Sequence, residues 1–204
     1  MHVVQRSRLG RDFNKIYRQL YYEIYTYGRA SELLWRRMIN YVSLAVENSD
    51  TMSIVIEDLS KLLRISHSHY EKAKNYVALA ELADEGDQEV KDLLEKAYNN
   101  ALLIDEYHSK VMILADIATV AYRNSLFGLG DKIISDIVAL AKNGSIEDFI
   151  DAHLLMARAL YFKDLSDSDT IFNYCYELVD RISLNKTKAV YLIKIASYYK
   201  NTFK

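Results

Sequence analysis

Histidine and carboxylate side chains at short spacings are the first residues in this sequence that could do chemistry. Asp105 and His108 stand three residues apart, the spacing of half a di-iron carboxylate site on one helix. Such a site needs a second motif of the same kind, and the sequence has none. His67 and His69 stand two residues apart in a polar connection, a spacing that directs them to different faces of a helix. We therefore expect capping or exposed roles for these residues, with no metal and no cofactor.

Arg64 and His69 carry the strongest argument for an enzyme. Their spacing is similar to the Arg-x4-His motif of the HEPN family of all-α ribonucleases, in which the two side chains pair at a dimer interface. Ile65 follows the arginine where a polar residue is usual, and residues 65–68 predict a helix break between the pair. We therefore expect a protein that is not an enzyme, with an HEPN-like ribonuclease or toxin-type protein using Arg64 and His69 as the alternative.

The remaining reactive side chains fit a protein interior. His153 shares its position in the repeat register with Tyr76, Val111 and Ala189, a position that faces the core, so we expect a hydrogen-bonded core histidine. Cys175 is the single cysteine and lies on the apolar helical stripe that contains Phe172, which predicts a buried, inert thiol. One cysteine also excludes an internal disulfide framework.

Composition points to an all-α fold. Proline is absent from the 204 residues and glycine occurs six times, too little turn chemistry for an all-β or Rossmann-type fold. The formal net charge of −2 gives no general attraction to nucleic acid or anionic lipid. No apolar run approaches the roughly 18 residues of a membrane span, and residues 1–13 lack a signal-peptide core. We expect a cytoplasmic protein without a membrane partner.

Helical periodicity is nearly continuous along the chain. It predicts ten helices separated by Gly28 and by polar clusters such as residues 84–87 and 165–169. Ser68 with Glu71 and Ser145 with Asp148 have the spacing of capping boxes. The helices are expected at about 11–27, 30–48, 52–65, 69–85, 88–103, 107–123, 130–142, 147–163, 169–182 and 186–201.

Small alanines recur among large aliphatic residues in several of these helices. Aligned on Ala80, Ala115, Ala157 and Ile193, the segments lie 35, 42 and 36 residues apart, with one further helix between each pair. A small residue lets the neighbouring helix approach closely. Helical hairpins of this period stack into an α-solenoid, because no hairpin buries its apolar face alone.

Residues from about 68 to 201 resemble degenerate tetratricopeptide-type (TPR-like) repeats of the archaeal, uncharacterised kind, as in "KVMILADIATVAYRNSLFGLGDKIISDIVALAKNGS" at 110–145. The usual Trp–Leu–Gly–Tyr signature and the closing proline are missing, which leaves HEAT-like packing open. The resemblance implies an all-α, right-handed α-α superhelix of about ten helices. It would form one domain over 1–204, with 1–50 as an N-terminal cap and 51–204 as stacked hairpins.

Tyrosine is the compositional outlier, with 17 copies. Tyr17, Tyr21 and Tyr25 form one stripe of the first expected helix, in a segment rich in Lys and Arg. We expect this helix to pack lengthwise on the second one, with its phenol groups reaching solvent. A homodimer contact and an RNA-stacking surface are the alternatives for this basic, tyrosine-rich N-terminus.

The repeat alignment also predicts a binding surface. Its first position is apolar in each repeat, at Val77, Met112, Leu154 and Val190. Its second position is charged and changes from acidic to basic along the chain, at Glu81, Asp116, Arg158 and Lys194. Because the first helix of each hairpin lines the concave face in TPR-like solenoids, this surface would form a groove for an extended peptide or a partner helix. We expect a non-catalytic scaffold or adaptor with a protein or peptide partner. Its expected partner-binding residues are Val77, Glu81, Asp84, Met112, Asp116, Arg123, Leu154, Arg158, Tyr161 and Lys194.

Overall fold

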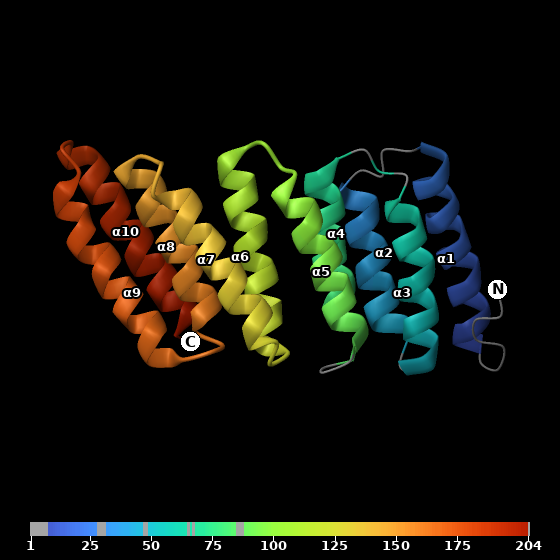
Figure 1. Ribbon diagram of the computed structural model, residues 1–204. Coiled ribbons are helices and arrows are strands. Elements are labelled where there is room, and N and C mark those ends of the chain that lie inside the picture. Colours follow the sequence, from blue (N-terminus) through green and yellow to red (C-terminus); the bar gives the residue numbers. More distant parts are fainter. Residues whose placement is uncertain are drawn as a thin grey trace. The chain divides into compact units, whose positions relative to one another are not determined.

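A computed structural model describes residues 8–27, 32–46, 49–64, 66, 68–84 and 88–203 of the protein. Within these ranges every regular element is helical, which confirms the all-α prediction and the ten expected helices (Figure 1). They are α1 (Arg8–Tyr27), α2 (Glu32–Ala45), α3 (Ser49–Leu63), α4 (His69–Ala80), α5 (Gln88–Leu102), α6 (Tyr107–Arg123), α7 (Phe127–Ala141), α8 (Ile146–Leu160), α9 (Leu165–Leu178), the 3-10 turn η1 (Val179–Arg181) and α10 (Asn185–Thr202).

Side-chain caps explain where several helices begin. Ser145 and Asp148 form the expected capping box at the start of α8. Ser68 accepts a hydrogen bond from the Glu71 amide at 3.2 Å and caps α4. The prediction of a helix break at residues 165–169 was wrong, because these residues are the first of α9. The side chain of Asp164 accepts the amide of Ser166 at 2.7 Å, so α9 starts four residues earlier than predicted.

The chain divides into two compact units, Met1–Leu103 and Ile104–Lys204. In the first unit, α1 packs on α2 and α3, both α2 and α3 contact α4, and α4 pairs with α5. In the second unit, α6 pairs with α7 and α8 pairs with α9, while α8 also packs on α6. Helix α10 contacts α8, α9 and η1. The hairpins predicted for α4–α5, α6–α7 and α8–α9 are therefore present.

The aligned alanines lie at helix contacts, as their spacing predicts. Ala80, Ala115 and Ala157 are buried. The Ser168 hydroxyl on α9 donates a hydrogen bond to the carbonyl oxygen of Ala157 on α8, at 2.7 Å. A neighbouring helix can come this close to a helix backbone only where the intervening side chain is small. Ile193 is the exception in the alignment, because it is exposed.

Helix α1 packs on α2 as expected. Phe13 is buried and its ring stacks on that of Tyr41, with 5.4 Å between centroids. Tyr17 and Val42 are also buried, so the apolar residues of α2 gain a cover from α1. The expectation that the phenol groups reach solvent was wrong for Tyr17, whose hydroxyl is buried. Tyr25, two stripe positions beyond Tyr17 on α1, is exposed.

Two glycines of α7 give a matched test of packing in the second unit. A Cβ atom added at Gly130 would lie closer than 3.0 Å to three ring carbons of Tyr122, whereas one added at Gly128 would meet nothing within 4 Å. Tyr122 is buried and donates a hydrogen bond to Asp131 at 2.8 Å, so its ring has little freedom to move.

We expect Gly128→Ala to stabilise the protein by up to about 1 kcal/mol, because alanine restricts the unfolded chain and favours helix. Gly130→Ala should instead destabilise it, because overpacking costs about 1–3 kcal/mol and outweighs that gain. Urea denaturation of both variants measures the difference. Equal stabilisation by the two substitutions would contradict the packing of Tyr122 on α7.

Candidate binding surfaces

The structure confirms the buried roles of His153 and Cys175. The Nδ1 atom of His153 lies 2.8 Å from the carbonyl oxygen of Phe149, which can only accept, and the two rings stack with 4.0 Å between centroids. Burial lowers the pKa of His153 and keeps its imidazole neutral. Burial raises the pKa of the Cys175 thiol to about 12, which suppresses its reactive thiolate.

Arg64 and His69 are separated by the break that the sequence predicts. Helix α3 ends at Leu63 and α4 begins at His69, and the side chains of Arg64 and His69 are both exposed. His69 already has a hydrogen-bonding partner within the first unit, because its Nδ1 atom lies 3.1 Å from Oδ1 of Asn100 on α5. The absence of catalysis stays a prediction.

Of the histidines singled out for metal binding, His69 and His108 are exposed. The Nε2 atom of His108 lies 3.5 Å from Oδ1 of Asp148, and Asp105 is exposed. Within the part of the chain that the structure describes, no three His, Cys, Asp or Glu residues gather as a metal site would need. His67 lies outside the described residues.

In the first unit, the expected binding surface is interrupted. Val77 is buried in α4, while Glu81 and Asp84 are exposed beyond its last residue, Ala80. Because α4 is shorter than predicted, Asp84 does not continue the helical stripe that begins at Val77. These three residues therefore do not form one accessible row on α4.

In the second unit, Leu154 does not belong to the accessible apolar row that the alignment predicts. This residue is fully buried in a core cluster with Ala157 and Phe172. The next residue, Leu155, is half-buried and takes the accessible position on α8. Met112 on α6 is 38% exposed, as the alignment predicts. The difference on α8 arises because α9 covers the face that carries Leu154.

The charged positions of the second unit pair with one another across neighbouring helices. Arg158 on α8 forms an ion pair with Asp116 on α6. Lys194 on α10 forms another with Asp151 on α8, at 2.7 Å. All four side chains are partly exposed. Asp151 was not among the residues predicted from the sequence, although it lies two helical turns before Arg158 and therefore on the same stripe of α8.

Arg123 and Tyr161 are brought together through aromatic residues that the alignment did not include. The Arg123 guanidinium lies over the ring of Phe162, with 4.3 Å to its centroid. Phe162 meets Tyr161 edge to face at 5.2 Å, and Tyr161 meets Phe203 at 5.5 Å. Phe162 lies two residues beyond the last residue of α8, inside the helix expected at 147–163, and Phe203 directly follows α10.

A hollow lies on the first unit, between α1 and α3, and has a volume of about 580 Å³. Its α1 wall is rich in tyrosine and its α3 wall is charged. The Nζ atom of Lys61 lies 2.9 Å from Glu57 and 3.4 Å from Asp58. Burial raises the pKa of Tyr21, and the nearby Asp58 carboxylate adds to that effect. The lining residues are Arg18, Tyr21, Tyr22, Tyr25, Ile54, Glu57, Asp58 and Lys61.

The sequence matches no family model, no curated protein and no solved structure. Its class is therefore defined by the architecture alone: an all-α protein whose helices pack as hairpins against their neighbours. None of the described helices combines the length and the apolar character needed to cross a bilayer.

Proposed function

We propose that this protein is a non-catalytic helical-repeat scaffold that binds a peptide segment of a protein partner. Its hairpins would continue one another in a right-handed TPR-like or HEAT-like superhelix. The peptide site would lie on the accessible sides of α6, α8 and α10 in the second unit. The observation that carries this proposal is the pair of cross-helix ion pairs, Asp116–Arg158 and Asp151–Lys194, beside the exposed Met112.

The ion pairs favour binding because they hold long side chains in place before a partner arrives. A restrained Arg or Lys loses less conformational entropy on binding than a free one. Alternating charge on adjacent helices also orients a bound chain. Met112 adds an adaptable apolar contact, since its unbranched side chain fits many shapes.

Arg123 sets the expected chemistry of one end of the peptide. Its guanidinium suits a carboxylate, and it already lies against the Phe162 ring. Met112 and Arg123 are 11 residues apart on α6, which corresponds to roughly 16 Å along the helix axis. An extended peptide covers that distance in about five residues. We therefore expect a peptide with an apolar residue and an acidic residue about five positions apart.

Selection of phage-displayed random peptides on the whole protein tests this proposal. Enriched peptides should share that spacing. They should bind the double variant Met112→Gln/Arg123→Gln at least about tenfold more weakly, since these side chains supply the two anchors. Tyr176→Gln, which changes an exposed residue of α9, is the control and should leave binding unchanged.

A charge exchange separates recognition from stability. Asp116→Arg combined with Arg158→Asp keeps the ion pair but reverses its direction, so the fold should persist while peptide binding weakens. Failure to enrich any peptide, or equal binding by wild type and Met112→Gln/Arg123→Gln, would overturn the proposed site.

The non-catalytic part of the proposal needs its own test. RNA should remain intact when it is incubated with the protein in the presence of a metal chelator. RNA cleavage that disappears in His69→Ala would replace the scaffold with an HEPN-like ribonuclease. RNA binding at the N-terminal hollow is the weaker alternative, because Glu57 and Asp58 place two carboxylates where RNA would bring phosphates.

A further inference from the structure

Helix α10 exposes an apolar stripe. Val190 is 54% exposed, Leu192 is 41% exposed and Ile193 is 72% exposed. Ala189 and Ala196 lie beside them and are exposed as well, so the prediction that Ala189 faces the core was wrong. Over Asn185–Thr202, all of which the structure describes, Ile195 is the one buried residue. The spacing of the exposed residues at three and four positions is that of a helix packing against another helix.

Four of these five positions are buried in both preceding helices of the alignment, and the fifth, Val190, aligns with the buried Leu154 on α8 and with the exposed Met112 on α6. Ile193 aligns with Ala157 on α8 and Ala115 on α6, at spacings of 36 and 78 residues. Leu192 aligns in the same way with Met156 and Leu114. All four of these counterparts are buried. The exposure of α10 is therefore a departure from a pattern that this chain establishes twice.

Helix α8 shows what covers this face. The Ser168 hydroxyl of α9 reaches the Ala157 carbonyl oxygen at 2.7 Å, and Phe172 of α9 joins Ala157 in the core cluster. The natural occupant of the α10 stripe is therefore a helix that lies along α10 as α9 lies along α8. The small side chains of Ala189 and Ala196 would allow such a helix to approach closely.

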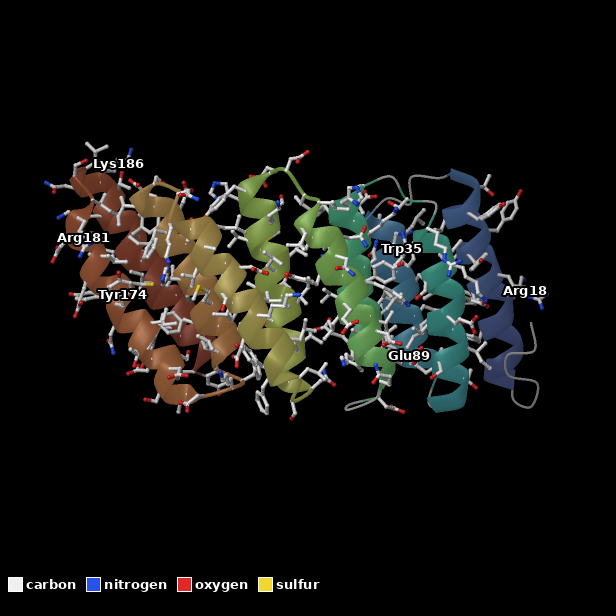
Figure 2. The ribbon with its side chains drawn as sticks, viewed as in Figure 1. Arg18, Trp35, Glu89, Tyr174, Arg181 and Lys186 are labelled. Carbon is white, nitrogen blue, oxygen red and sulfur yellow. The ribbon has the colours of Figure 1, made fainter. Side chains whose placement is uncertain are left out.

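Charge indicates which kind of helix fits. Lys186 and Lys200 are exposed seven residues before and after Ile193, so they mark the two ends of the stripe, and Figure 2 shows Lys186 at the start of α10. Neither lysine makes an ion pair within the described residues, and α10 contains no Asp or Glu. The helices that cover this face elsewhere carry more acidic than basic residues, with Asp131 and Asp136 on α7 and Asp167, Asp169 and Glu177 on α9.

The same charges oppose a second copy of this chain. Two α10 stripes packed antiparallel about Ile193 would bring the lysines at their ends together. Like charges facing one another across an interface cost free energy and select against that pairing. An acidic helix would instead place carboxylates beside Lys186 and Lys200 while its apolar residues cover Val190 and Ile193.

We propose that the exposed stripe of α10 is a docking surface for an acidic amphipathic helix of a partner protein. The stripe consists of Ala189, Val190, Leu192, Ile193 and Ala196, bounded by Lys186 and Lys200. It spans four helical turns, roughly 21 Å, between the two lysines. The two sites meet at Val190, which lies one turn before Lys194, but Leu192, Ile193 and the two lysines take no part in the peptide site proposed above, so the two proposals are tested separately.

The test uses the whole protein and a phage-displayed library of 18-residue helical peptides. Each peptide has an apolar stripe at helical spacing, and its flanking positions are randomised between Glu and Lys. Peptides with Glu flanks should be enriched. The best of them should bind Ile193→Glu, and separately Lys186→Glu/Lys200→Glu, at least about tenfold more weakly than wild type.

Two control variants make the result specific. Tyr176→Glu alters an exposed residue of α9, and Asp116→Arg/Arg158→Asp alters the proposed peptide site, so both should bind the helix as wild type does. Enrichment of Lys flanks, no enrichment, or unchanged binding by Ile193→Glu would overturn the proposal. A wild-type dimer in sedimentation that becomes a monomer in Ile193→Glu would also overturn it, since the occupant would then be a second copy.

Discussion

Phe172→Ala is expected to lower the free energy of unfolding by about 3–5 kcal/mol, the range for removing a buried phenylalanine ring. Phe172 is buried on α9, in the core cluster that includes Leu154. Its ring also meets Tyr199 on α10 at 5.3 Å and Phe203 just beyond α10 at 5.8 Å. The substitution should therefore weaken the attachment of α10 as well as the α8–α9 contact.

Tyr176→Ala is the matched control, because Tyr176 lies one turn further along α9 and is 63% exposed. Truncating it should change stability by no more than about 0.5 kcal/mol. Urea denaturation followed by far-UV circular dichroism compares the two variants. Similar midpoints for Phe172→Ala and wild type would mean that α9 does not use this face to hold α10.

The existence of the helices could be predicted because it depends on local information. Apolar residues recur at helical spacing, and Ser145 with Asp148 satisfies the free amides of a first turn without help from elsewhere in the chain. Boundaries were less certain where several polar residues could serve as the cap. Residues 164–169 contain three aspartates and two serines, and the chain uses Asp164.

The candidate site depends on information that one helix does not contain. Whether Leu154 or Leu155 faces solvent is decided by where α9 packs on α8, and the repeat alignment fixes that only to within about one residue. The alignment also placed Asp116 and Arg158 on one surface without indicating that they would neutralise each other. Opposite charges in one register of adjacent helices were the available signal for that pairing.

The exposed face of α10 could not have been recognised from periodicity. Leu192 and Ile193 have the same apolar pattern as their buried counterparts on α6 and α8. A hydrophobic pattern states which face of a helix favours burial, and the presence of a covering helix decides whether that face is buried. The structure supplies the second piece of information, because no described helix covers this stripe.

Overpacking one of the aligned alanines tests the repeat register itself. Ala157→Leu should destabilise the protein by about 1–3 kcal/mol, the usual effect of adding methylene groups to a packed interior. Ala157 is fully buried, and the Ser168 hydroxyl lies 2.7 Å from its carbonyl oxygen, so a larger side chain must push α9 away from α8. Ser168 is itself fully buried, and its hydroxyl would lose a hydrogen-bond partner as the helices separate.

Ala139→Leu is the control, since Ala139 lies on the exposed side of α7 in the same unit. Alanine and leucine differ little in helix propensity, so this variant should melt close to wild type. Thermal denaturation of the two variants then isolates packing from local preference. If Ala157→Leu also melted as wild type does, the small residues would not set the distance between helices, and the alignment from which both proposed surfaces are drawn would lose its physical basis.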